Sequence, residues 1–278
     1  MKRFLAETRR LAAAVGAAIF VSAGFSHTAR AEFLLTPLRQ VVSEETPEAH
    51  FTVSNPSRRI LEGRVSWIDL TATETGYAVA KPESRTYLSA APYLEVAPAQ
   101  FRLEPGAQAE ITVKLREGVR PPKGERRSHL LVEAAAARTP IRKASQGGLE
   151  LDIGLGVSAP VILRGGRGAA RASISKTRLL RDADGLLELS TTIEPKGTFS
   201  AYGRVVAIMR PAHGDENGPQ VLAERNNVAG YLDAPARRVS LPLGLTFLPE
   251  GVLELRYEGA AEFEGEVFTR RIYEIESR

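Results

Sequence analysis

The chain has 278 residues, of which 25% are charged and 6% aromatic, and it contains no cysteine. This length provides one large or two ordinary domains, and the lack of cysteine excludes a disulfide framework and a thiolate metal site. Residues 1–31 hold five of the 37 basic residues and one of the 33 acidic residues, so the remainder carries 32 of each. This balance gives no reason to expect nucleic acid as a partner.

The first 31 residues have the pattern of a cleavable secretory signal peptide. Basic residues precede an apolar run at 11–25, and Ala29-Arg30-Ala31 is a small-x-small cleavage signal. The apolar run is shorter than the roughly 20 residues that span a bilayer, although an uncleaved anchor remains the alternative. We therefore expect a periplasmic protein without stable membrane insertion, and an exported chain without cysteine fits the bacterial periplasm or surface.

From residue 32 to residue 164, short segments of alternating apolar and polar residues are separated by turn residues. This alternation is typical of strands with one buried face, and turns about every 8–12 residues favour a β-sandwich. The polar stretch 71–86 contains turn residues, and 118–127 and 138–148 are predicted loops. Between residues 32 and 164 we count seven strands, the number of an immunoglobulin-like sandwich. They lie in the segments 32–42, 49–55, 60–70, 93–115, 128–137 and 147–166, of which 93–115 holds more than one strand.

The segment 147–166, GGLELDIGLGVSAPVILRGG, has a strict two-residue periodicity. One face is apolar throughout, whereas Gly154, Gly156 and Pro160 fall on the other face. Ordinary strands have about five or six residues, so this strand is longer than its own sheet requires. Two interpretations are open: an ordinary core strand with an extended tail, or a strand that also serves a partner.

Residues 165–171, GGRGAAR, have the composition of a hinge, and the strand pattern restarts after them. Asp184-Gly185 between two apolar segments predicts a hairpin, and about seven strands are expected over 170–278. No segment has the pattern of a long amphipathic helix. The sequence therefore predicts an all-β protein with a signal peptide, 1–31, and two immunoglobulin-like β-sandwich domains, 32–165 and 166–278, joined by a short hinge.

Five segments of the first domain, taken in order, carry a family resemblance. They are LTPLRQVV (35–42), FTVSNPS (51–57), GRVSWIDL (63–70), YLEVAPAQFRLEPGAQAEITVKL (93–115) and PKGERRSHLLVEA (122–134). Their order and spacing resemble the periplasmic chaperones of chaperone–usher pilus assembly, whose first domain also closes with a long alternating strand. The second domain matches only in being a sandwich of the right size. The resemblance implies two sandwiches in an L or boomerang arrangement, with Trp67 buried.

The resemblance further implies a binding protein without enzymatic activity or cofactor. Family members bind pilus subunits that lack their last strand, and they lend a strand of their own by donor-strand complementation. The subunit then passes to an outer-membrane usher. Pilus or fimbrial subunits and an usher are therefore the expected partners. The expected donor stripe consists of Leu149, Leu151, Ile153, Leu155, Val157, Ala159 and Val161.

Family members also bind the C-terminal carboxylate of the subunit through two basic residues. Arg39 matches the first of them, although an ordinary solvated arginine is the alternative. The second is a lysine, and Pro160 stands in its place, so Arg164 is assigned to the anchor and Arg167 is a further candidate. Arg127 replaces a glutamate of the family, which predicts that the usual ion pair of that glutamate with Arg164 cannot form.

No catalytic or metal-binding pattern accompanies these features. His50, His129 and His213 lack metal-ligand spacing, and neither a nucleophile elbow nor a phosphate-binding loop occurs. We therefore expect no metal, cofactor or small-molecule substrate. Two other hypotheses stay open. One is a structural or adhesive β-sandwich protein of the surface or periplasm that has lost the chaperone role, which the missing lysine favours. The other is an enzyme of unrecognised type.

Overall fold

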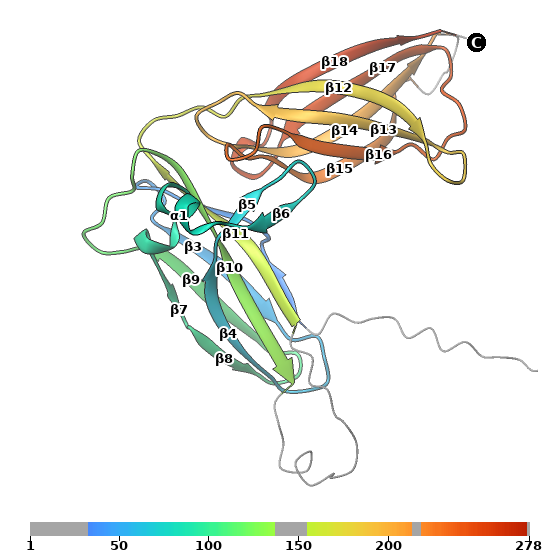
Figure 1. Ribbon diagram of the computed structural model, residues 1–278. Helices are drawn as coiled ribbons and strands as arrows, with labels where there is room; N and C mark the ends of the chain where they lie inside the picture. The colour runs from blue at the N-terminus through green and yellow to red at the C-terminus, as the bar shows by residue number, and fades with distance from the viewer. Residues whose placement is uncertain (1–32, 137–154, 213–217, 277–278) are drawn as a thin grey trace, which may run out of the picture. The chain divides into compact units, whose positions relative to one another are not determined.

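The computed structural model describes residues 33–136, 155–212 and 218–276. Strands dominate this part of the chain (Figure 1), and the all-β prediction is confirmed. The described residues contain one α-helix, α1 (Pro82–Leu88), and two 3₁₀ turns, η1 (Ala91–Tyr93) and η2 (Ala261–Phe263). Helix α1 begins at a proline, which suits the first helical position because its N–H needs no partner there.

The first sandwich is built from two sheets and a separate hairpin. Its described residues, 33–136 and 155–165, form eleven strands rather than the predicted seven. The first segment breaks into two strands, the segment 93–115 forms three, and the polar stretch 71–86 contributes a hairpin. One sheet has the order β1 (Leu34–Thr36), β3 (Glu48–Ser54), β9 (Gln108–Leu115) and β7 (Leu94–Ala97). The other has the order β2 (Gln40–Val42), β11 (Leu155–Gly165), β10 (Gly124–Ala136), β4 (Leu61–Ile68) and β8 (Gln100–Leu103). The hairpin pairs β5 (Leu70–Ala72) with β6 (Tyr77–Val79).

The core of this sandwich follows from the alternation of its strands. In β3, Ala49, Phe51 and Val53 are buried while the residues between them are not, as a two-residue period requires. The same core receives Val132 from β10, so both sheets contribute to it. Trp67 packs against this core but is only partly buried, which corrects the expectation of a buried tryptophan.

A buried asparagine fixes the turn that follows β3. The Asn55 side chain donates hydrogen bonds to the carbonyl oxygens of Arg59, Leu103 and Glu104 at 2.8 to 3.1 Å. Gly106 completes the neighbouring turn with a φ of 77°, in the left-handed region that favours glycine. The hydrogen bonds of Asn55 therefore connect the segments 51–57 and 93–115, although the bonded residues lie about fifty positions apart in the sequence.

The two longest strands of the first sandwich, β10 and β11, lie side by side (Figure 1). They pair antiparallel from Gly124 opposite Gly165 to Ala134 opposite Leu155. Strand β10 therefore begins inside the predicted loop 118–127 and places Glu125 and Arg127 in the sheet. Gly165 ends β11 against other backbone: a Cβ atom there would lie 2.2 Å from the Pro122 carbonyl oxygen.

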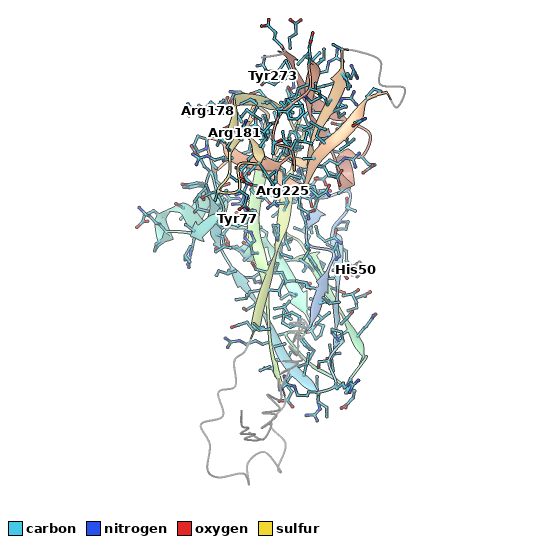
Figure 2. All side chains as sticks on the ribbon, turned by 90° about the vertical axis from the view of Figure 1, so that its right-hand side faces the viewer. His50, Tyr77, Arg178, Arg181, Arg225 and Tyr273 are labelled. Atoms are coloured by element: carbon cyan, nitrogen blue, oxygen red, sulfur yellow. The ribbon has the colours of Figure 1, made fainter. Side chains whose placement is uncertain are left out.

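The described residues of the second sandwich form seven strands, in line with the prediction of about seven, and the first two form the hairpin expected from Asp184-Gly185. Tyr273, labelled in Figure 2, lies in β18 (Val267–Ile275). Its hydroxyl joins the two sheets by donating a hydrogen bond to Thr177 Oγ1 at 2.8 Å. Buried residues from both sheets form one apolar core. One sheet has the order β12 (Ala172–Arg181), β13 (Leu187–Pro195) and β16 (Arg237–Pro242). The other has the order β15 (Gln220–Gly230), β14 (Ala201–Pro211), β17 (Gly251–Gly259) and β18 (Val267–Ile275).

Candidate functional site: an arginine pair and an open strand edge

Arg39 lies between β1 and β2, where the first segment crosses from one sheet to the other. Its side chain is 4% exposed, so Arg39 is not a solvated surface residue. The guanidinium donates two hydrogen bonds to the Glu262 carboxylate, from Nη1 to Oε2 at 2.7 Å and from Nη2 to Oε1 at 2.8 Å. It also lies 4.5 Å from the centre of the Tyr202 ring. This two-pronged geometry gives arginine strong and specific hold of a carboxylate.

Arg164, near the end of β11, reaches the same carboxylate. Its Nη1 lies 3.1 Å from Glu262 Oε1, its Nε donates to Glu125 Oε2 at 3.0 Å, and its Nη2 donates to the Ser200 carbonyl oxygen at 3.2 Å. We call Arg39 and Arg164 the arginine pair. The structure thus brings together the two residues assigned to the anchor, and they converge on a carboxylate of η2 that the sequence did not indicate.

The electrostatics of the site favour the charged form of each partner. Burial by itself would lower the pKa of Arg39, but its hydrogen bonds and charge attraction to Glu262 raise it. Burial would likewise raise the pKa of Glu262, but the hydrogen bonds and charge of Arg39, with the charge of Arg164, lower it. The site therefore holds an ionised carboxylate between two guanidinium groups, and its chemistry is carboxylate binding.

Arg164 does not pair with residue 127, as predicted, but it still has an acidic partner in the first sandwich. Arg127 does replace the expected glutamate, but Glu125 lies directly opposite Arg164 in the β10–β11 register and supplies the carboxylate. Glu125 also accepts hydrogen bonds from the backbone N–H of Ser200 at 3.1 Å and from the Ser200 hydroxyl. Because Ser200 belongs to the second sandwich, this cluster links the two sandwiches.

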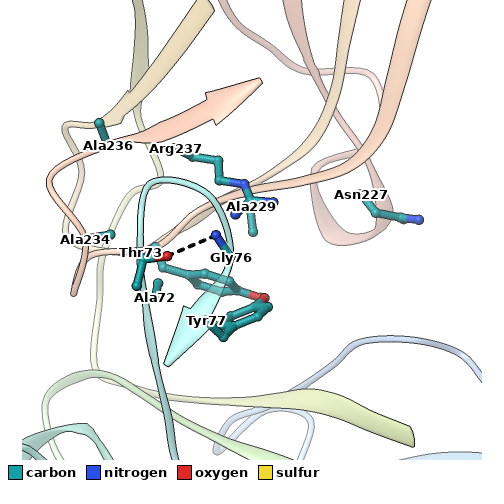
Figure 3. Close-up of a pocket in the computed structure, with 10 residues that line it drawn as sticks. Ala72, Thr73, Gly76, Tyr77, Asn227, Ala229, Ala234, Ala236 and Arg237 are labelled. Carbon is teal, nitrogen blue, oxygen red and sulfur yellow. Dashed lines mark hydrogen bonds between the residues drawn. The ribbon is translucent and has the colours of Figure 1, made fainter. Parts of the chain in front are cut away.

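The β5–β6 hairpin makes a further set of contacts with the second sandwich. The Ala72 N–H donates to Asp233 Oδ2 at 2.7 Å, and the Arg238 N–H donates to the Glu74 carbonyl oxygen, also at 2.7 Å. Beside these contacts lies a small pocket (Figure 3). Its lining comes from the hairpin and from the 227–237 region: Ala72, Thr73, Gly76, Tyr77, Asn227, Ala229, Tyr231, Ala234, Ala236 and Arg237.

Strand β11 has an open edge over half its length. On one side it pairs with β10 throughout, whereas on the other side it pairs with β2 only from Val161 to Leu163. Within the described residues, no other strand pairs with the 155–160 part of β11 along that side. Such an edge presents unpaired N–H and C=O groups that a partner strand can use.

The predicted donor stripe divides into three parts. Ala159 and Val161 are buried in the protein's own core, and Val157 packs against that core, so these residues already serve this sandwich. Leu155 is 44% exposed at the open edge. Leu149, Leu151 and Ile153 lie outside the described residues. Among the described residues of the stripe, Leu155 is therefore the one left exposed to a partner.

The other two residues singled out near the end of β11 have different surroundings. Pro160 lies opposite His129, one residue before the pairing with β2 begins. A proline within a sheet is tolerated at such an edge because it has no N–H to donate. Arg167 lines an open hollow together with the arginine pair and Glu262, and because Glu44 and Glu45 line it as well, the rim of the hollow carries both charges.

The described residues hold no group of three or more histidine or acidic side chains arranged to bind a metal ion. In the same part of the chain, no helix combines the length and the apolar character needed to cross a membrane.

No protein-family model and no curated protein matches the chain. Several solved structures align with most of it. The YadV chaperone is 8% identical, covers 87% of this chain and 100% of its own, and has a TM-score of 0.45. A structure of the Salmonella enterica SafA pilin in complex with the SafB chaperone contains a chain that is 15% identical. The match covers 89% of this chain and 98% of that chain, with a TM-score of 0.43. The Pseudomonas aeruginosa CupB2 chaperone is 12% identical, covers 86% of this chain and 97% of its own, and has a TM-score of 0.42. At TM-scores this low, the likenesses carry no argument about what this chain does.

Proposed function

We propose that this protein is a periplasmic chaperone that captures pilus or fimbrial subunits by donor-strand complementation and delivers them to an outer-membrane usher. The observation that carries the proposal is the open edge of β11, with Leu155 exposed on it and the arginine pair at its far end. Together they match the two things that an incomplete subunit needs: a strand for its open sheet and a site for a carboxylate.

The energetics of the edge favour capture of a partner. Burying one leucine-sized or isoleucine-sized side chain gives roughly 1.5–3 kcal/mol. Leu149, Leu151, Ile153 and Leu155 together would contribute of order 10 kcal/mol before the entropy cost of association. Main-chain hydrogen bonds along the edge add geometric specificity, because they fix the direction and register of the incoming strand.

The proposal is tested by co-expressing the protein with a secreted subunit encoded beside it and recovering the complex from the periplasm. Replacing Leu151, Ile153 and Leu155 together by Asp should abolish recovery, because three charges would enter the apolar groove of the subunit. A matched control replaces Leu179, Leu180 and Val221 of the second sandwich, which are exposed, by Asp. Unchanged recovery with the first triple variant would overturn the donor-strand role.

A second candidate function is a structural or adhesive β-sandwich protein of the cell surface or periplasm. Pro160 favours it, because a proline occupies the position of the second family anchor. Surface labelling of intact cells would support this function. Release of the protein by osmotic shock, in complex with a subunit, would favour the chaperone instead.

A further inference from the structure

The arginine pair is already occupied. Both oxygens of the Glu262 carboxylate face Arg39, and one of them also faces Arg164. A side-chain carboxylate and a chain-terminal carboxylate present the same planar pair of oxygens to a guanidinium group. Glu262 therefore satisfies the arginine pair with the same chemical group that a subunit terminus would bring.

The arginine pair has no two free N–H donors side by side that could bind a second carboxylate. Both terminal nitrogens of Arg39 are bound to Glu262. The three nitrogens of Arg164 are divided among Glu125, Glu262 and Ser200. Arg39 Nε has no hydrogen-bond partner within the described residues, but it is buried. An incoming carboxylate can make a two-pronged contact with Arg39 only by taking the place of Glu262.

Of the two carboxylates that contact the arginine pair, Glu262 is the more easily displaced. Glu125 has a side chain 6% exposed and is held by Ser200 as well as by Arg164. Glu262 has a side chain 26% exposed, and it borders the open hollow. It also sits in the three-residue turn η2, whose first residue, Ala261, has a φ of 56°. A non-glycine residue adopts this left-handed conformation rarely and at a cost.

We infer that Glu262 is an internal occupant of the arginine pair, and that a partner's terminal carboxylate binds by displacing it. The inference rests on the proposed function, because it concerns the anchor of that same site. The second sandwich thereby has a role in capture, because Glu262 of η2 occupies the arginine pair until a carboxylate of the partner replaces it. Such competition lowers the apparent affinity in proportion to the fraction of molecules whose site is open.

The experiment compares two forms of one synthetic peptide, an alternating valine–serine strand ending in a free α-carboxylate or in an amide. With Glu262→Gln, the neutral side chain no longer competes, so the carboxylate peptide should bind about tenfold more tightly or better than to the wild type. The amide peptide should be unaffected. Glu262→Asp keeps the charge but shortens the reach, and it should tighten binding in the same direction by a smaller factor.

Two control variants separate displacement from other effects. Glu264→Gln, at the residue that follows η2, changes the net charge equally but removes a different carboxylate. Glu74→Gln breaks another ion pair between the sandwiches, that with Arg238, and should leave peptide affinity unchanged. Adding Arg39→Ala to Glu262→Gln should abolish the preference for the carboxylate peptide.

The inference is overturned if Glu262→Gln binds the carboxylate peptide no more tightly than the wild type does, or if neither protein distinguishes carboxylate from amide. The proposed function is judged separately, by recovery of the subunit in co-expression. If the subunit is recovered but Glu262→Gln does not change the affinity for the carboxylate peptide, the displacement of Glu262 is wrong and the chaperone role is still supported.

Discussion

Arg127 and Asp233 form a two-pronged ion pair, with one residue from each sandwich. Arg127 Nη1 donates to Asp233 Oδ1 at 3.0 Å and Nη2 to Oδ2 at 2.8 Å, and both side chains are largely buried. The guanidinium also lies 3.9 Å from the centre of the Tyr231 ring. The residue that departs from the family pattern in the first sandwich thus has a partner of opposite charge in the second.

Replacing Asp233 by Asn should lower the free energy of unfolding by about 3–5 kcal/mol, because it leaves Arg127 buried without its counter-charge. Arg127→Met combined with Asp233→Leu should cost less than this, since no unpaired charge remains. Urea denaturation followed by tryptophan fluorescence measures both values. A double variant that is less stable than Asp233→Asn alone would contradict this account.

Replacing Arg39 by Lys should reduce subunit recovery several-fold. Lysine keeps the positive charge but loses the planar fork that holds a carboxylate at two points. Thermal unfolding of the same variant checks that the fold survives. Recovery equal to that of the wild type would mean that charge alone, without two-pronged geometry, is sufficient.

The effect of an aspartate substitution in β11, on subunit capture or on folding, should depend on the position that is substituted. Leu155→Asp should abolish subunit capture with little change in the unfolding midpoint, because Leu155 is exposed at the open edge. Val161→Asp should prevent stable folding, because Val161 is fully buried and its charge would have no partner. Leu180→Asp, at a site 46% exposed in the second sandwich, is the control for both measurements. Equal behaviour of Leu155→Asp and Leu180→Asp in capture would speak against the edge as the binding site.

His129 should make the protein sensitive to mild acid. Burial, reinforced by the charge of Arg127, lowers the pKa of His129 from 6.5 to about 3. The unfolded chain therefore takes up a proton below pH 6.5 that the native protein refuses until about pH 3. Stability is fully present above pH 6.5 and is lost as the pH falls through this window, by up to about 4–5 kcal/mol.

Removing the imidazole should flatten that dependence. Within the described residues neither ring nitrogen of His129 has a hydrogen-bond partner, so His129→Phe removes buried polar atoms that make no compensating bond. The variant should be at least as stable as the wild type at pH 7 and clearly more stable at pH 5 in urea denaturation. The pH dependence that remains is then due to carboxylates such as Glu262, whose lowered pKa acts in the same direction.

The strands were predictable because alternation depends on neighbouring residues. Strand β3 lies within one residue of the predicted segment 49–55, and the β12–β13 hairpin follows from its Asp-Gly turn. The split of the first segment into β1 and β2 was not predictable, since which sheet a short strand joins depends on partners elsewhere in the chain. The β5–β6 hairpin was missed because its polar sequence is stabilised by contacts with the second sandwich rather than by an apolar face of its own.

The site was predictable only on the side of the first sandwich. Arg39 could be singled out within a recognisable segment, whereas Glu262 lies 223 positions away in a stretch without a distinctive pattern. Asp233 is likewise 106 positions from Arg127. Ion pairs between distant segments leave no periodicity in the sequence. The sequence showed that an arginine stands at position 127 where a glutamate was expected, but nothing in it showed that Arg127 is buried and therefore needs an acidic partner.

The open edge of β11 also bears on how the protein behaves when no partner is present. An exposed strand edge can pair with any extended chain, including a second copy of the same protein. Pro160 interrupts the row of N–H donors just before β2 takes over, so within the described residues only a short stretch is left to self-associate. In its proposed role as a chaperone, the protein would keep the edge that can self-associate short. The carboxylate contact would then supply binding energy that does not depend on the length of that edge.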